Sequence, residues 1–361
     1  MKTAKIIMTL LALTFMVSCV DYYRMVTTLD RKGNVYRELY AHGDSAFMAG
    51  NNSRNPFLFD ISPDWTVNRY DTAFNYNFFG NDENLNVKIS KTTNSIEDYS
   101  KNIRCDSDMR SFAVPEESLT KRTRGFYTYY SLKVIYKKLQ YEAPISIDNY
   151  LNKDEQLLWT QGSFDNYKAM NGSEMNDYLS EINDKATKWY ARNLFEINLI
   201  SIKKLTENYD LDRDKENIFI KWAKFLKFDT INIDPKTVCN VLDSFYVTTY
   251  FSKLYNTNHE ILDNNFNQLQ DSSFKINTDI FGKDISYELV VPGKMLQTNA
   301  PIIHSDTLVW QVDGMRLLFA DYSLEAKYRI VNKWAFLLTG LLIVIAIGSI
   351  VALIKRKGVR I

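Results

Sequence analysis

The chain has 361 residues, of which 45% are hydrophobic and 24% charged, and its formal net charge at pH 7 is +1. This balance argues against a nucleic-acid partner, and the apolar content is sufficient for one large domain or two ordinary ones. The three cysteines are too few for a disulfide-stapled scaffold.

The first 18 residues are predicted to be a signal peptide. Lys2 and Lys5 precede an apolar run at 6–17 that is too short to span a membrane comfortably. The run ends in Phe-Met-Val-Ser-Cys, which resembles the lipobox of bacterial lipoproteins. The resemblance implies that Cys19 is lipidated and becomes the mature N-terminus. An ordinary cleaved signal or an uncleaved N-terminal anchor are the alternatives.

The segment 19–146 reads as the strand-rich part of an extracytoplasmic domain. Two strands are predicted at 21–29 and 35–41, joined by a turn that contains Asp30 and Gly33. The clearest strand is at 126–139, where one face is wetter than the other because the residues alternate with period two. Shorter strands are expected at 57–61, 74–79 and 85–90.

The segment 147–275 changes to helical periodicity and is predicted to be a large helical insertion. Its longest helix begins at Gly172-Ser173, with Ser173 as the expected N-cap, and apolar residues recur every three or four positions up to Ile200. Further helices are expected at 215–228 and after Asp234-Pro235.

Strands return in the segment 276–333, which is expected to complete the sheet domain. Strands are predicted at 285–291, 307–312 and 318–329, with Asp313-Gly314 as a hairpin turn between the last two. Because the first strand leaves the membrane and the last returns to it, we expect these two to be antiparallel, and they could be neighbours.

Residues 334–354 carry no charge and predict a transmembrane helix. At about 1.5 Å per residue this helix would be roughly 31 Å long, enough to cross a bilayer core of about 30 Å. The tail 355–361 is basic, which is typical of a cytoplasmic flank. We therefore expect a single-pass protein of the inner (cytoplasmic) membrane, with an extracytoplasmic main domain and a cytoplasmic C-terminus.

Candidate chemical motifs are weak. His42, His259 and His304 are isolated, so no metal site is expected. The acidic run from Asp210 to Glu216 lacks the glycine and glutamate of a calcium loop and reads as a solvated turn. His42, Asp44 and Ser45 are too close in sequence to converge as a triad. We expect no catalytic residue, cofactor or metal.

Two further patterns leave alternatives open. Cys105 and Cys239 could pair in an oxidising compartment or remain two separate buried thiols. The aromatic pair Tyr127 and Tyr129 could bind sugar or lipid, although packing within the sheet is the simpler interpretation.

The C-terminal third resembles LppM-type envelope lipoproteins, which have a lipid anchor and a C-terminal helix. The resemblance implies a similar membrane arrangement and an outward domain that binds envelope lipids. It rests on these segments: Pro292-Gly293-Lys294-Met295, Thr298-Asn299-Ala300, Leu308-Val309-Trp310 and Ala320.

We therefore predict an α+β protein: an antiparallel, strand-rich sheet domain with a large helical insertion and one C-terminal transmembrane helix. The expected function is non-catalytic binding of a lipid, a cell-wall component or a protein by a membrane-anchored envelope lipoprotein. The alternatives are a scaffold or assembly subunit of an envelope complex and, less favoured, an enzyme of unrecognised class. The expected partners are the bilayer and an envelope lipid or protein, and the oligomeric state is left open.

Overall fold

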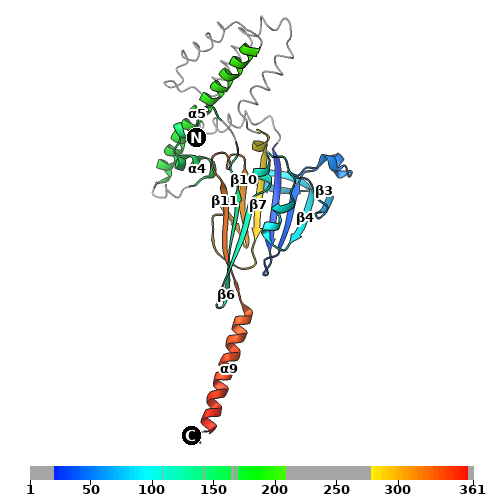
Figure 1. The fold of residues 1–361 in the computed structure, drawn as a ribbon, viewed down its shortest axis with the longest axis vertical. Coiled ribbons are helices and arrows are strands. Elements are labelled where there is room, and N and C mark those ends of the chain that lie inside the picture. Colours follow the sequence, from blue (N-terminus) through cyan, green and yellow to red (C-terminus); the bar gives the residue numbers. More distant parts are fainter. Residues whose placement is uncertain are drawn as a thin grey trace. The chain divides into compact units, whose positions relative to one another are not determined.

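The computed structural model describes residues 20–107, 109–140, 143–163, 167, 170–208 and 278–356 (Figure 1). Several predictions fall outside these residues and stay predictions. They are the signal peptide 1–18, Cys19, the acidic run Asp210–Glu216, the helices expected at 215–228 and after Asp234, Cys239, His259 and the end of the basic tail.

The strands form a seven-stranded sheet in the order β3-β4-β2-β1-β7-β10-β9 and a four-stranded sheet in the order β5-β6-β11-β8. Their bounds are β1 Asp21–Leu29, β2 Val35–Ala41, β3 Thr66–Phe78, β4 Asn81–Thr93, β5 Glu116–Arg124, β6 Tyr127–Tyr136, β7 Lys283–Val290, β8 Lys294–Thr298, β9 Ile302–His304, β10 Thr307–Asp313 and β11 Tyr322–Val331.

The helices include two long ones, α5 and α9. Their bounds are α2 Ser45–Met48, α3 Arg110–Ala113, α4 Lys153–Gln161, α5 Gly172–Asn208 and α9 Lys333–Arg356, with short 3-10 turns η1 Asn52–Arg54, η2 Ile96–Asp98, η3 Ser100–Asn102, η4 Ile147–Asn149 and η7 Thr278–Gly282.

The chain divides into two compact units. The sheet unit is built from Asp21–Lys137, Lys283–Asp313 and Asp321–Ile361, so it contains both sheets and α9. The helical unit takes in Lys138–Gly282 and Gly314–Ala320 and contains α4 and α5.

The predicted α+β class is confirmed, and the larger sheet is mixed rather than purely antiparallel. β1 pairs antiparallel with β2 on one side and parallel with β7 on the other. β11 lies in the other sheet, between β6 and β8. The expectation that the first and last strands could be neighbours is therefore wrong, because β2 and β7 occupy both hydrogen-bonding edges of β1.

The core of the sheet unit lies between the two sheets and follows the period of the strands. In β6 the residues Thr128, Tyr130, Leu132, Val134 and Tyr136 are buried and alternate with more accessible ones, as predicted. The inward face of β1 contributes a matching set: Tyr23, Met25, Thr27 and Leu29. Period-two burial on one face is what a sheet packed on a second sheet requires.

The strand predicted at 57–61 is wrong. Phe57 and Phe59 are buried, but they lie in a loop held by Asn55. The Asn55 side chain accepts a hydrogen bond from the Phe57 N–H at 3.1 Å and donates to the Phe59 carbonyl at 2.7 Å. A side chain that bonds the nearby backbone in this way competes with a strand ladder.

The predicted hairpin turn at Asp313-Gly314 is also wrong, and the last strand begins at Tyr322 rather than 318. Between β10 and β11 the chain enters the helical unit. There the Leu317 carbonyl accepts a hydrogen bond from the Leu139 N–H at 2.8 Å, and the Phe319 ring stacks on Trp159 with centroids 5.9 Å apart. Tertiary packing therefore overrides the local turn signal.

The helical unit shows the predicted amphipathic packing, but its start differs. Asn171, not Ser173, is the N-cap of α5, because its side chain accepts the backbone N–H groups of Ser173 and Glu174 at 3.0 Å. The shorter α4 has a complete capping box formed by Asn152 and Glu155 and was not predicted. The buried cluster of this unit is Ile147, Leu151, Leu158, Ile182, Ala186 and Trp189.

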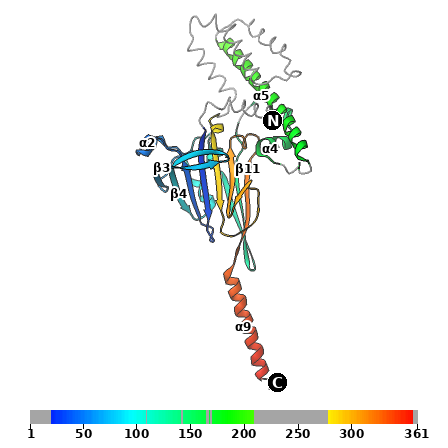
Figure 2. The same cartoon turned by 180° about the vertical axis from the view of Figure 1, so that it is seen from behind.

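The predicted helix at 334–354 is confirmed by α9. It is 24 residues long, and among the residues with a described structure it is the one helix long and apolar enough to cross a membrane (Figure 2). It begins directly after β11, with Asn332 as the single intervening residue.

The backbone of Arg329 lies close to Gly293, and this contact leads to a prediction for stability. A Cβ atom there would lie 2.4 Å from the Arg329 carbonyl oxygen. We expect Gly293→Ala to destabilise the sheet unit by about 1–3 kcal/mol, because backbone must move to relieve the overlap. Gly172→Ala is the control, since no atom lies within 4 Å of a Cβ at that helix start. Equal thermal unfolding midpoints for the two variants, measured by circular dichroism, would contradict the prediction.

Candidate functional site

The outer face of the seven-stranded sheet, opposite the core, carries polar and charged side chains. Along β7, Ile285, Tyr287 and Leu289 point into the core, so Ser286 and Glu288 lie on the outer face. Yet Ser286 is fully buried and Glu288 is only 7% exposed. Something other than the second sheet must therefore cover this face.

The cover is the far end of the β3–β4 hairpin. The Tyr76 hydroxyl of β3 donates to Glu288 Oε1 at 2.5 Å and lies 3.0 Å from Ser286 Oγ. Three strands separate β3 from β7 in the sheet, and four strand spacings amount to roughly 19 Å, far beyond the reach of a tyrosine. The hairpin must therefore curl over the outer face, and the β3–β4 register breaks between Arg69 and Phe74.

An ion pair lies beneath the curled hairpin. Arg24 of β1 donates to both carboxylate oxygens of Glu288, at 2.7 and 2.9 Å. The Arg24 guanidinium also lies 4.7 Å from the Tyr76 ring centre and 5.2 Å from that of Tyr40. The Arg24 side chain is 26% exposed, whereas that of Glu288 is 9% exposed. The arginine therefore presents part of its polar surface to solvent.

These residues line a cleft with a volume of about 440 Å³, within the usual range for small-molecule sites. Burial and the hydrogen bond to Glu288 raise the pKa of Tyr76 to about 12, so its hydroxyl remains a donor at neutral pH. The cleft thus combines a cation, a carboxylate, hydroxyls and aromatic rings. Its lining is Arg24, Tyr76, Asn77, Phe79, Ser286, Glu288, Ile302, His304, Thr307 and Val309.

A second cavity is apolar but very small. It holds about 10 Å³, close to the space of one water molecule, and is lined mainly by aromatic and aliphatic side chains such as Phe57, Phe59 and Met25. An acyl chain does not fit in this volume.

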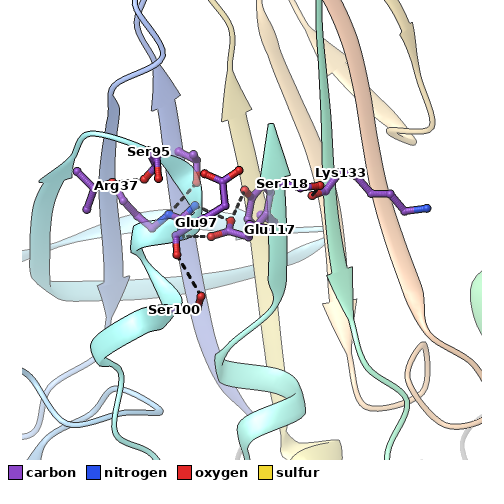
Figure 3. A network of polar contacts seen from close by, with 10 residues as sticks. Arg37, Ser95, Glu97, Ser100, Glu117, Ser118 and Lys133 are labelled. Atoms are coloured by element: carbon purple, nitrogen blue, oxygen red, sulfur yellow. Dashed lines mark hydrogen bonds and ion pairs between the residues drawn. The ribbon is translucent and has the colours of Figure 1, made fainter. Parts of the chain in front are cut away.

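A different ion pair joins the two sheets inside the core (Figure 3). Arg37 of β2 donates to both oxygens of Glu117 of β5, at 2.9 and 2.7 Å, and to Thr27 Oγ1 at 3.1 Å. The side chains are 3% and 0% exposed. Burial raises the pKa of Glu117, and the guanidinium charge and its hydrogen bonds oppose that rise.

Tyrosines enclose this buried pair. The Tyr287 hydroxyl donates to Glu117 Oε1 at 3.3 Å, and the Arg37 guanidinium lies 4.0 Å from the Tyr99 ring centre. The hydroxyls of Tyr99 and Tyr136 are buried without a hydrogen-bond partner among the described residues. Because this network is closed to solvent, we interpret it as structural and the outer cleft as the candidate site.

The residues that the sequence analysis considered for a catalytic triad or a metal site do not come together in one site. His42 contacts the Asn84 carbonyl through Nδ1 at 3.0 Å, and Asp44 caps α2 by accepting the Phe47 N–H at 2.8 Å. His42, Asp44 and Ser45 form no hydrogen bond with one another in the described structure. Among the same residues, no three His, Cys, Asp or Glu side chains group as metal ligands.

His304 is the one histidine of the described residues that lines the cleft, on edge strand β9. Tyr127 and Tyr129 lie half-buried in β6 with ring centres 6.4 Å apart. Cys105 is half-buried, and both alternatives for it, a pair with Cys239 or two separate thiols, stay open because Cys239 lies outside the described residues.

The sequence reasoning missed Arg24, Tyr76 and Glu288. The polar residues at alternate positions of β7 could have indicated a second, polar face of this strand, opposite its apolar face. Nothing local could have indicated Tyr76, because its contact depends on the curl of a hairpin that lies three strands away.

No protein-family model and no curated protein matches the chain. Among solved structures, the folded domain of LppM from Mycobacterium tuberculosis is similar with a TM-score of 0.27 and 8% identity, over 88% of this chain and 94% of that chain. A likeness at this level assigns neither a family nor a function to the chain.

The buried ion pair gives a prediction by substitution. Glu117→Gln leaves the Arg37 charge buried without a carboxylate and should destabilise the protein by about 3–5 kcal/mol. Replacing both partners, as Arg37→Met with Glu117→Leu, should cost less than this single change, because no charge is then left buried alone. Urea denaturation of the detergent-solubilised chain measures both. A double variant no more stable than Glu117→Gln would contradict the structural interpretation.

Proposed function

We propose that the protein is a membrane-tethered, non-catalytic binding protein of the bacterial envelope, and that the outer cleft of its sheet unit is the binding site. The main domain lies outside the cytoplasm, tied to the inner membrane by α9 and by an acyl chain on Cys19. The observation that carries the proposal is the Arg24–Glu288 pair, with Arg24 partly exposed, in a cleft of about 440 Å³. The sheet unit that holds this cleft also contains the membrane-length helix α9.

The cleft favours a polar, hydroxyl-rich ligand, such as a cell-wall glycan. Arg24 and Glu288 largely neutralise each other, so neither a strongly anionic nor a strongly cationic ligand is selected. Together with Tyr76 they offer donors, acceptors and an aromatic face. An acyl chain offers no hydrogen-bond partner to the part of Arg24 that still faces solvent, and burying an unpaired polar group costs about 1–3 kcal/mol. A glycan hydroxyl can serve as both donor and acceptor.

Binding without catalysis is supported by the contacts of Glu117 and Glu288, two of the buried carboxylates among the described residues. Glu117 and Glu288 are each held by both oxygens to an arginine and each accepts a tyrosine hydroxyl. A carboxylate held in this way is poorly placed to move a proton in general acid or base catalysis.

A scaffold role would call for an exposed apolar patch on the helical unit. Among the described side chains of that unit, Met170 is the large apolar one that is exposed. A single exposed residue does not favour the alternative.

The binding site is tested with soluble, lipid-free glycan fragments of the cell wall. Isothermal titration calorimetry of the detergent-solubilised full chain should detect binding. Arg24→Met combined with Glu288→Gln should weaken it at least about tenfold, because hydrogen bonds to charged groups contribute about 1.5–3 kcal/mol each. Replacing both partners leaves no lone buried charge.

The matched control is Lys88→Met with Glu38→Gln. This pair lies on the same outer face with its atoms 3.0 Å apart, but neither residue lines the cleft. The control should bind within about twofold of the parent chain. Absence of binding by the parent, or equal binding by the cleft variant, would rule out the glycan site.

Topology is tested separately by proteolysis. Protease added to intact spheroplasts should degrade the sheet and helical units and leave a fragment that contains α9. A cytoplasmic marker protein should stay intact in the same sample. Survival of the main domain until the spheroplasts are lysed would place it in the cytoplasm and contradict the proposal.

A further inference from the structure

A row of cations crosses the four-stranded sheet near its membrane end. Arg122 of β5 lies opposite Tyr129 of β6. On its other side, Tyr129 lies opposite Arg329 of β11, and Arg329 in turn lies opposite Lys294 of β8. Directly opposed residues share one face of a sheet. That face is the outer one, because the flanking residues, such as Thr128 and Tyr130 in β6, point into the core.

A second row lies closer to the end of the β5–β6 hairpin, where Arg124 is opposite Tyr127. Two positions separate it from the first row, so both rows occupy the same face. We call the set Arg122, Arg124, Lys294, Arg329, Tyr127 and Tyr129 the collar.

The collar carries positive charge that carboxylates do not neutralise. Arg122, Arg124 and Lys294 are exposed and form no ion pair within the described structure, and the Arg329 guanidinium lies 4.4 Å from the Tyr127 ring centre. Two lysines farther along the same face are paired with carboxylates: Lys133 with Glu325 at 3.1 Å, and Lys137 with Glu116 at 3.0 Å. Lys327, between them and the collar, donates to the Gln297 side chain at 3.1 Å. Positive charge is therefore concentrated at one end of this sheet face.

That end is fixed to the start of α9. The Asn332 N–H donates to the Phe126 carbonyl at 2.8 Å, and the Asn332 side chain donates to the Gly125 carbonyl at 3.2 Å. The Phe126 ring packs on Phe336, in the first turn of the helix, with centroids 4.5 Å apart. The hairpin end cannot leave the helix start without breaking these contacts.

The distances place the collar at the lipid headgroups or within a Debye length of them if α9 spans a bilayer. Arg329 precedes Lys333 by four residues, at most about 13 Å of extended chain. The headgroup layer adds roughly 5–8 Å to each side of the hydrocarbon core, and the Debye length at physiological salt is about 8 Å. Trp334, which is exposed at the start of α9, is an aromatic side chain of the kind that favours this interface.

We propose that the collar is a binding surface for the headgroups of anionic phospholipids in the leaflet where α9 enters the membrane. The unpaired guanidinium and ammonium groups bind headgroup phosphates, and the sheet is thereby held upright on the bilayer. This inference rests on the proposed membrane tether and is independent of the ligand of the outer cleft.

The test uses Trp334, which is 60% exposed at the start of α9. The full chain is reconstituted in phosphatidylcholine bilayers that contain either brominated phosphatidylglycerol or brominated phosphatidylcholine, with bromine near the headgroup end of the acyl chains. Quenching that is lost in Trp334→Phe reports the lipids around the helix start. We expect phosphatidylglycerol to be preferred about fivefold or more, from the attraction of a surface cation to an anionic lipid, and the preference to fall with added salt.

Arg122→Gln with Arg124→Gln should lower that preference at least about twofold, because the variant removes two of the four cations of the collar. The matched control, Lys133→Gln with Lys137→Gln, removes the same charge from the same sheet face at a greater distance from the helix and should keep the preference. Equal quenching by both lipids in the parent, or an equal loss in both variants, would overturn the headgroup site while leaving the tether intact. Absence of Trp334 quenching by either lipid would overturn the tether and the headgroup site together.

Discussion

The bidentate ion pair between Arg37 and Glu117 holds the two sheets of this protein face to face. Both charges are removed from water, so each depends on the other, and any slip of one sheet against the other would leave a charge buried alone. Tyr287 and Thr27 add hydrogen bonds to the same pair. The pair is satisfied when β2 and β5 face each other as they do here.

With the inner faces fixed, the two outer faces are free to differ. On the seven-stranded sheet, the β3–β4 hairpin curls back and converts a flat face into a cleft, with Tyr76 as the contact that closes it. On the four-stranded sheet the outer face stays open and carries separated charge. Its paired end includes Lys133 and Glu325, and its unpaired end lies beside α9.

The connection between the sheet unit and α9 is very short. Asn332 is the one residue between β11 and α9, and its backbone and side chain both bond the β5–β6 hairpin. If α9 spans a bilayer, its orientation therefore also orients the sheet unit. The outer cleft and the collar are joined to α9 through this one residue and its hydrogen bonds rather than through a long linker.

The sequence alone determined the elements whose cause is local. The uncharged run of α9, the turn between β1 and β2, and the alternation along β6 each follow from the order of neighbouring residues, and the structure confirms them. Only the tertiary structure decided the rest. The parallel pairing of β1 with β7, the Arg37–Glu117 pair and the contact of Tyr76 with Glu288 join residues far apart in the chain. No local periodicity encodes such contacts, because they depend on which surfaces meet after the strands have formed.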